Sequence, residues 1–318
     1  MYKKFSKKYG ICLHMSKKCR KFACKFVQTM SELVKRTIFG ALFVGAVVAA
    51  ILWRAHSFCG LFLVFTILAV DEFHRMVKSP IPLRIYSFLA TMALWAMILC
   101  FAWSTRDGVN RVELGLIMGA AYFPIVAITL LDEIWNHSGR PLQNWGNFFI
   151  SQFMIALPLA TLCFLYFLNK WLLLALFVLI WVNDTGAYCV GSLTAKRKNG
   201  NHKMTPHISP KKSWEGLFGG VLFTILASFV LYRLGWFDAM ALKKVSMFGA
   251  LLFGLLVSIF ATMGDLMESL MKRSLGVKDS GVFLPGHGGI LDRFDSVLLA
   301  APVLTFYCWI CSFIAPML

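Results

Sequence analysis

The side chains best suited to chemistry gather in the last third of the chain. One set has offsets of three, four and seven residues, which would place it on one face of a helix: Asp265, Glu268, Ser269 and Lys272. Asp292 and Asp295 lie three residues apart in "DRFD" and would share a helical face in the same way. Mg²⁺ typically binds one or two carboxylates together with substrate phosphates. These acids beside a lysine therefore favour metal-assisted transfer of a phosphoryl or nucleotidyl group.

A glycine-rich loop, "FLPGHGGILDRFDS" at 283–296, connects these features. Its glycines lack a Cβ atom and would let backbone N–H groups approach a phosphate closely: Gly286, Gly288 and Gly289. His287 could donate to that phosphate or act as an acid, and a local hydrogen bond is the alternative. Basic side chains around the loop would bind phosphate oxygens: Lys272, Arg273, Lys278 and Arg293.

A further acid, Asp184 in "WVNDTGAY", also interrupts an apolar stretch. An ionisable residue within a membrane span is costly and usually marks a functional or paired site. We expect Asp184 to meet Asp265 and the "DRFD" acids in one polar pocket, with further polar candidates at Glu268, Ser269 and Asp279. The alternative is that the acids form structural ion pairs with nearby bases: Lys272, Arg273 and Arg293.

A second polar loop, 191–216, carries six Lys and Arg residues. Lys211, Lys212 and Ser213 are expected at the start of a helix, where free N–H groups and the helix dipole bind anions. A phosphate site and a simple topology signal explain this charge equally well. No histidine pair has the spacing of a zinc site, so we expect no zinc.

The composition is that of an integral membrane protein. Hydrophobic residues make up 58% of the 318 residues, charged residues 15%, and the mean hydropathy is +0.70. The apolar stretches have about the length that crosses a ~30 Å hydrocarbon core as helix. We therefore predict an all-α protein with about nine membrane helices, near 37–53, 57–70, 85–104, 113–131, 147–168, 171–190, 214–234, 245–270 and 294–316.

Charge predicts the orientation of these helices, because Lys and Arg in short loops favour the cytoplasmic side. Of the 32 Lys and Arg residues, 25 lie in 1–36 and in four alternate loops: 71–84, 132–146, 191–213 and 271–293. The N-terminus is thus expected in the cytoplasm, the C-terminus outside, and the polar pocket facing the cytoplasm. Topology and anionic headgroups account for the net charge of +17, and no folded basic domain remains to bind nucleic acid.

Three regions are expected: a basic cytoplasmic segment at 1–36, N-terminal membrane helices at 37–168, and a C-terminal catalytic membrane region at 169–318. The nine cysteines are mostly scattered. The Cys308 and Cys311 pair lies in the last apolar stretch and is interpreted as small apolar helix residues rather than a redox pair.

The run "SLMKRSLGVKDSGVFLPGHGGILDRFD", 269–295, resembles the signature of the phosphatidate cytidylyltransferase family, also called CDP-diacylglycerol synthases. Fourteen residues fill the signature without a gap: Ser269, Lys272, Arg273, Lys278, Asp279, Gly281, Leu284, Pro285, His287, Gly288, Gly289, Asp292, Arg293 and Asp295. The stretches "WVNDTGAYCVG" and "ISPKKSWEG" are also similar to the family. The long basic N-terminus departs from the family pattern.

The resemblance implies a dimeric inner-membrane enzyme that joins CTP and phosphatidic acid into CDP-diacylglycerol and pyrophosphate. It also implies Mg²⁺, with K⁺ as a second cation. The family's metal-site acids correspond to Asp265, Asp292 and Asp295. Further polar motif positions correspond to Asp184, Lys211, Lys272 and Arg293.

Three other functions remain to be weighed. The spaced Asp-Gly, Ala-Arg and paired-Asp pattern of CDP-alcohol transferases is not found in the sequence. An ion-coupled transporter would need acids near the bilayer midplane and inverted repeats, whereas the polar motifs crowd into the C-terminal half. A structural scaffold would not need the loop at 271–293.

Overall fold

A computed structural model describes most of the chain. The described residues are 37–107, 112–136, 139–196, 200–237, 245–281 and 288–314. The predicted basic segment 1–36 lies outside them, as do two of the candidate phosphate-binding residues, Gly286 and His287.

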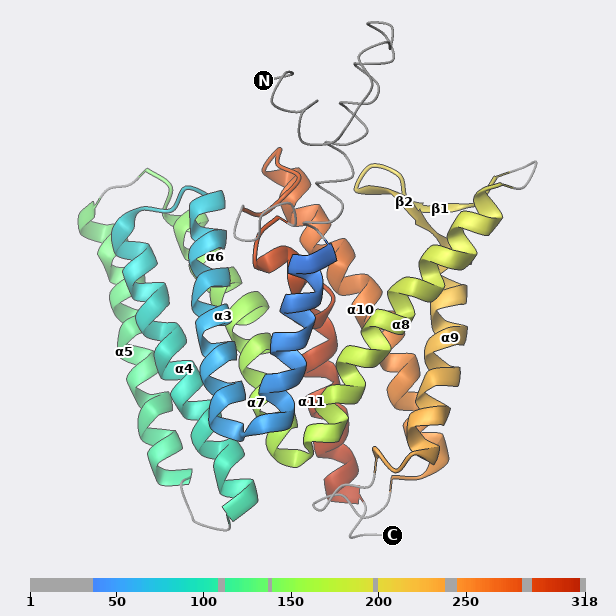
Figure 1. Ribbon diagram of the computed structural model, residues 1–318. Helices are drawn as coiled ribbons and strands as arrows, with labels where there is room; N and C mark the ends of the chain where they lie inside the picture. The colour runs from blue at the N-terminus through green and yellow to red at the C-terminus, as the bar shows by residue number, and fades with distance from the viewer. Residues whose placement is uncertain are drawn as a thin grey trace, which may run out of the picture.

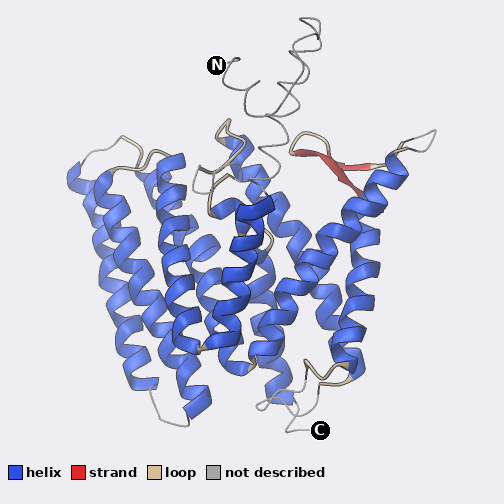
Figure 2. Cartoon of the chain, viewed as in Figure 1, coloured by secondary structure: helices blue, strands red, loops and turns tan. Residues whose placement is uncertain are grey.

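The described chain is a helical bundle, as Figures 1 and 2 show. Its order is Thr37–Trp53, α3 (Ala55–Met76), α4 (Ile81–Asp107), α5 (Val112–Asn136), α6 (Pro141–Ile150), η1 (Ser151–Ala156), α7 (Leu157–Leu168), α8 (Lys170–Ala195), β1 (Lys203–Thr205), β2 (Ser209–Ser213), α9 (Trp214–Arg233), α10 (Met247–Ser274), η2 (Leu291–Arg293) and α11 (Val297–Ile314).

Among the described residues, seven helical segments are long and apolar enough to cross a membrane, with α6, η1 and α7 counted as one. Two shorter apolar helices, Thr37–Trp53 and Val297–Cys311, complete the set of predicted spans. The predictions of an all-α fold and an integral membrane protein are therefore confirmed, and the predicted number of about nine spans is approximate. The division of the chain into three regions stays a prediction.

Helix α3 extends beyond the predicted span at 57–70 and ends at Met76. The predicted loop at 71–84 therefore begins within the helix, at two adjacent acids, Asp71 and Glu72. Both are bonded: Asp71 pairs with Arg84 of α4 and lies 2.6 Å from Arg75, and Glu72 Oε2 accepts from the Ile290 N–H at 2.7 Å. Because the charges have partners, the helix can continue past them.

A short β-hairpin departs from the all-α expectation. Strands β1 and β2 pair antiparallel, with Lys203 opposite Ser213. Ser213 then ends the strand and caps α9, accepting from the Gly216 N–H at 3.1 Å. The predicted helix start is thus correct to within one residue, but Lys211 and Lys212 lie on a strand rather than in the first helical turn.

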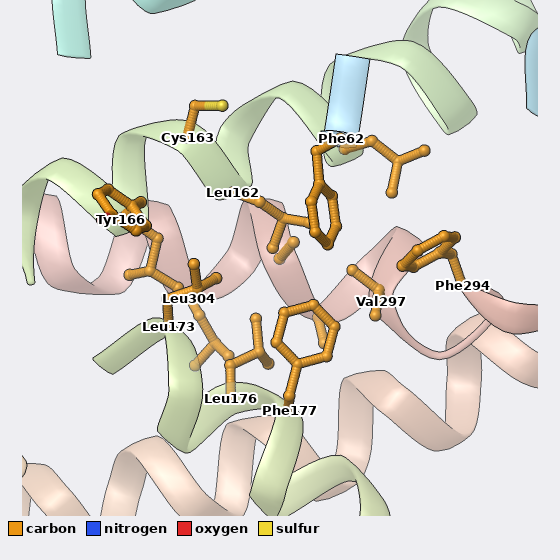
Figure 3. Packing of buried hydrophobic residues seen from close by; sticks show 14 of the residues in the cluster. Phe62, Leu162, Cys163, Tyr166, Leu173, Leu176, Phe177, Phe294, Val297 and Leu304 are labelled. Carbon is orange, nitrogen blue, oxygen red and sulfur yellow. The ribbon is translucent and has the colours of Figure 1, made fainter. Parts of the chain in front are cut away.

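The bundle packs around an aromatic and aliphatic core between α3, α7, α8 and α11, shown in Figure 3. The figure labels Phe62, Phe177 and Phe294 together in this packing. The ring of Phe294 lies 5.5 Å from those of both Phe62 and Phe65. Phe294 sits inside the "DRFD" motif and is 1% exposed, so it anchors the acidic turn to the core.

Truncating this anchor is expected to destabilise the protein. Phe294→Ala removes a fully buried ring and should lower the free energy of unfolding by about 3 to 5 kcal/mol. Thermal unfolding in detergent measures the effect. The control is Phe306→Ala, since Phe306 lies on α11 and is 59% exposed. Equal losses for both variants would contradict the anchoring role.

The polar segments share one end of the bundle. Figure 1 shows the hairpin, the C-terminal end of α10 and the η2 region at the same end. The first described helix, Thr37–Trp53, begins toward this end, and α11 finishes near the opposite one (Figure 1). This arrangement collects the candidate site residues on one side of the apolar bundle.

Candidate active site

A cavity of about 390 Å³ lies between the acids predicted to meet. Asp184 comes from α8, Asp265 from α10, and Asp292 and Asp295 from the η2 region. The structure thus brings these four acids from three separate segments to one cavity, whereas the further candidates Glu268, Ser269 and Asp279 do not line it. Its volume falls in the usual range of small-molecule sites, roughly 300 to 1,000 Å³.

The cavity also has an apolar side. Helix Thr37–Trp53 and helix α8 contribute its apolar lining: Gly40, Phe43, Val44, Val47, Phe177, Ile180 and Trp181. The remaining lining comes from the turn that leads into α11: Arg293, Phe294, Ser296 and Val297. The same cavity thus has acidic and basic side chains beside an apolar surface.

Strand β2 delivers a lysine to this site. Lys212 Nζ lies 2.8 Å from Asp265 Oδ2 and donates to the Thr262 carbonyl at 3.2 Å. Ser269, one helical turn beyond Asp265, donates to the other carboxylate oxygen at 3.3 Å. The hairpin therefore connects the loop at 191–216 to the acids of α10.

Lys272 is the second basic centre. Its Nζ lies 2.6 Å from Asp292 Oδ1 and also pairs with Glu268 Oε2, one turn earlier on α10. The side chains of Lys272, Glu268 and Asp292 are 11%, 0% and 9% exposed. The predicted ion pairing with Lys272 is thus present for Glu268 and Asp292. Two carboxylates this deeply buried depend on the one ammonium for neutralisation.

The other oxygen of Asp292 connects Ser280, before the glycine-rich loop, to Gly289 within it. Asp292 Oδ2 accepts from the backbone N–H of Ser280 at 3.0 Å and of Gly289 at 2.8 Å. Burial alone would raise the pKa of Asp292, but the Lys272 ammonium and these two N–H groups hold it below its usual range. Asp292 is therefore an ionised group already supplied with donors.

Asp295 has a different environment. Burial raises the pKa of Asp295 to about 7, and the carboxylates of Asp265 and Asp184 add to the rise. Gly264 lets helix α10 approach the backbone at Asp295 closely, because a Cβ at Gly264 would lie 2.6 Å from the Asp295 carbonyl oxygen. The three acids thus line one cavity closely enough for the charges of Asp265 and Asp184 to act on Asp295.

These acids suit a hard cation. Among the described residues, no three His, Cys, Asp or Glu side chains are already grouped as metal ligands. Mg²⁺ needs only one or two carboxylates when phosphates supply other oxygens. One or two of the acids that line the cavity would therefore suffice for an ion that binds together with a phosphate substrate.

The residue before Asp184 is a buried amide, Asn183, which bonds helix α8 to helix α10. Asn183 Oδ1 accepts from Ser258 Oγ at 2.5 Å, and its Nδ2 donates to Thr262 Oγ1 at 3.4 Å. Asn183 is 2% exposed, so these bonds connect α8 to α10 inside the bundle. Sequence reasoning did not single out Asn183. The signal that could have found it is a polar amide directly before Asp184 in the apolar stretch "WVND".

Other predicted site residues lie elsewhere. Arg273 is exposed and donates to the carbonyls of Ile208, at 3.4 Å, and Val277, at 3.1 Å. Lys211, Lys278 and Asp279 are exposed and do not line the cavity, whereas Arg293 does. Gly288 has a left-handed backbone, with φ of 83°, next to the Gly289 N–H that Asp292 binds. The phosphate-binding roles of the basic residues and of Gly288 stay predictions, as does a role for Asp279 in the polar pocket.

Sequence reasoning missed Glu72. This residue of α3 contacts both ends of the glycine-rich loop, through Ser280 Oγ and the Ile290 N–H. An acid between apolar residues in "AVDEFHRM" was a signal, but the segment had been interpreted as a loop.

Comparison with known proteins agrees with these motifs. The profile described as "Cytidylyltransferase family" matches residues 34–311. The chain belongs to the cytidylyltransferase family. The resemblance found in 269–295 thus extends over all the described membrane helices.

Several similar proteins are named phosphatidate cytidylyltransferase. The phosphatidate cytidylyltransferase of Bacillus subtilis is 34% identical over 249 residues, which cover 75% of this chain and 83% of that protein. Those of Staphylococcus epidermidis and Haemophilus influenzae are 46% and 37% identical over 128 and 136 residues. These two matches cover 40% and 43% of this chain and 45% of each relative.

Proposed function

We propose that the protein is a phosphatidate cytidylyltransferase, which transfers the cytidylyl group of CTP to phosphatidic acid. The observation that carries this proposal is the cavity, where four acids and Arg293 lie beside an apolar wall, with Lys212 of the hairpin paired to one of those acids, Asp265. Phosphatidic acid has an anionic head and apolar tails, so it needs both surfaces. The names of the relatives support the same reaction.

In this reaction, a phosphate oxygen of phosphatidic acid attacks the α-phosphorus of CTP in line. The bond between the α-phosphorus and its bridging oxygen breaks, and pyrophosphate leaves with that electron pair. The attacking oxygen is already anionic, so no general base is required. The main barrier is repulsion between two anionic substrates, which positive charge in the site reduces.

Lys212, Lys272 and Arg293 are the proposed phosphate-binding side chains near the cavity. Lys212 and Lys272 are held by the carboxylates of Asp265 and Asp292, which orient their ammonium groups before substrate arrives. Such preorganised charge lowers the cost of reorganisation during the reaction. Removing either lysine should therefore impair turnover.

Mg²⁺ is proposed as the cofactor, held by Asp265 and Asp295 with Asp184 nearby. When bound, it would supply charge neutralisation to the triphosphate. Asp292 was also predicted as a metal ligand. Two of the donors to its oxygens, at Ser280 and Gly289, are backbone N–H groups that cannot turn away, whereas the donors to Asp265, Lys212 and Ser269, are side chains that can move when an ion binds. We assign Asp292 first to positioning Lys272 and the loop. K⁺ as a second cation and a homodimer stay predictions.

The site is proposed to face the cytoplasm of an inner membrane. CTP is a cytosolic solute and phosphatidic acid lies in the leaflet, so the cavity must serve both. The excess of Lys and Arg in the loops at the same end supports this orientation.

Pyrophosphate release tests the proposal directly. Purified protein in detergent is mixed with phosphatidic acid and each of CTP, UTP, ATP and GTP, with and without Mg²⁺. Release that requires CTP, lipid and Mg²⁺ together is expected. Release without lipid, or none with any nucleotide from folded protein, would contradict it and make ion flux in proteoliposomes the next assay.

A further inference from the structure

The glycine-rich loop is closed at its base by two carboxylates. Ser280 precedes the loop of 283–296, and Gly289 and Ile290 belong to its second, described half. Asp292 Oδ2 accepts from the N–H groups of Ser280 and Gly289, as described above. Glu72 makes a second, parallel connection between the same two ends, and it comes from α3, some 200 residues earlier in the chain.

Each oxygen of Glu72 serves one end of the loop. Oε1 accepts from Ser280 Oγ, and Oε2 accepts from the Ile290 N–H at 2.7 Å. Ser280 is 8% exposed and Ile290 is fully buried, so water cannot easily replace the carboxylate. The bonds therefore hold the two ends at a defined separation.

Gly289 shows how closely the loop fits this carboxylate. A Cβ at Gly289 would lie 1.4 Å from Glu72 Oε1 and 2.2 Å from Ser280 Oγ. Any other residue at 289 would displace Glu72 or the loop. The glycine in the signature thus makes room for an acid of α3, in addition to any approach by phosphate.

We propose that Glu72 of helix α3 is a positioning residue that holds Ser280 and the segment from Gly288 to Asp292 in their working geometry. This inference rests on the proposed function. Glu72 acts through the loop and through Asp292, whose Oδ1 holds Lys272, and it does not touch the reacting atoms itself. Helix α3 in the N-terminal half is thereby part of the active-site framework.

The adjacent Asp71 provides a matched control. Asp71 pairs with Arg84 and Arg75, away from the loop, and neither partner lines the cavity. Glu72→Gln and Asp71→Asn each remove one carboxylate charge from the same turn of the same helix. Only the first should alter the loop.

The kinetic experiment compares Glu72→Gln, Glu72→Ala and Asp71→Asn by pyrophosphate release. A glutamine has one acceptor oxygen, so one of the two loop bonds is lost whichever way the amide turns. We expect the KM for CTP to rise roughly five- to tenfold for Glu72→Gln, the effect of losing one ordinary hydrogen bond, and further for Glu72→Ala. Asp71→Asn should leave KM unchanged.

Measuring KM and Vmax separately distinguishes a positioning role of Glu72 from simple destabilisation. A variant that only unfolds more readily has fewer active molecules, so its Vmax falls while its KM stays constant. Wild-type KM in both Glu72 variants would overturn the proposal. An equal rise of KM in Asp71→Asn would also overturn it, because the effect would then belong to α3 in general.

A second readout needs no substrate. Hydrogen exchange of the peptide that contains 288–294 is measured in the full protein, and Glu72→Gln should accelerate it at least roughly tenfold at Ile290 through loss of the acceptor. Unchanged exchange would overturn the proposal. If the wild type released no pyrophosphate, the proposed function would fail, whereas exchange would still decide whether Glu72 holds the loop.

Discussion

Lys272→Met should nearly abolish turnover and also destabilise the protein. The substitution leaves the buried carboxylates of Glu268 and Asp292 without their shared ammonium. Removing one partner of a buried ionic group typically costs about 3 to 5 kcal/mol. Loss of a preorganised charge at the phosphates should lower kcat/KM roughly 10²- to 10³-fold. Pyrophosphate release and thermal unfolding measure the two effects.

A double substitution separates these effects. Changing Glu268 to Gln in the Lys272→Met background removes one uncompensated charge and should recover part of the stability without recovering activity. Lys203→Met, on the exposed strand β1, controls for loss of one positive charge. Activity that returned together with stability would show that Lys272 serves folding alone.

Asp295→Asn should stabilise the metal-free protein at pH 8 while removing activity. The folded protein holds the pKa of Asp295 at about 7, above the ordinary value of 3.8, through burial and the nearby Asp265 and Asp184 carboxylates. Between pH 4 and 7, the unfolded chain loses this proton first, so the contribution of Asp295 to stability falls as pH rises. The variant lacks that penalty, which is on the order of 1 to 4 kcal/mol.

Thermal unfolding in EDTA at pH 5 and pH 8 checks this sign. The variant should exceed the wild type in Tm at pH 8 and approach it at pH 5. Added Mg²⁺ with CTP should raise the Tm of the wild type, because a ligand bound only to the folded state stabilises it, and should raise that of the variant much less. Equal stabilisation of both proteins would remove Asp295 from the proposed metal site.

The acids of the site were predictable because the membrane makes them costly. Asp184 and Asp265 interrupt apolar stretches, and such residues are rare unless they have partners or a function. Spacing along α10 also predicted that four polar residues share one face, and the structure shows two contacts on it between residues four apart, Ser269 with Asp265 and Lys272 with Glu268. Local periodicity was sufficient for both conclusions.

Contacts between distant segments were beyond such reasoning. Lys212 reaches Asp265 because a β-hairpin, unpredicted in an apolar helical chain, directs strand β2 toward α10. Glu72 was assigned to the loop at 71–84 because the apolar stretch, and with it the predicted span, ended at residue 70. Its partners, Ser280 and Ile290, lie more than 200 residues away.

The sequence by itself determined the membrane helices, the family signature and the identity of the acids, because hydropathy and short-range spacing are properties of consecutive residues. Only the tertiary structure decided how those acids divide their work. Asp292 accepts hydrogen bonds from Lys272 and from the Ser280 N–H, whereas Asp295 lies near the carboxylates of Asp265 and Asp184. The physical reason is burial: the environment of each carboxylate depends on which distant helices pack around it.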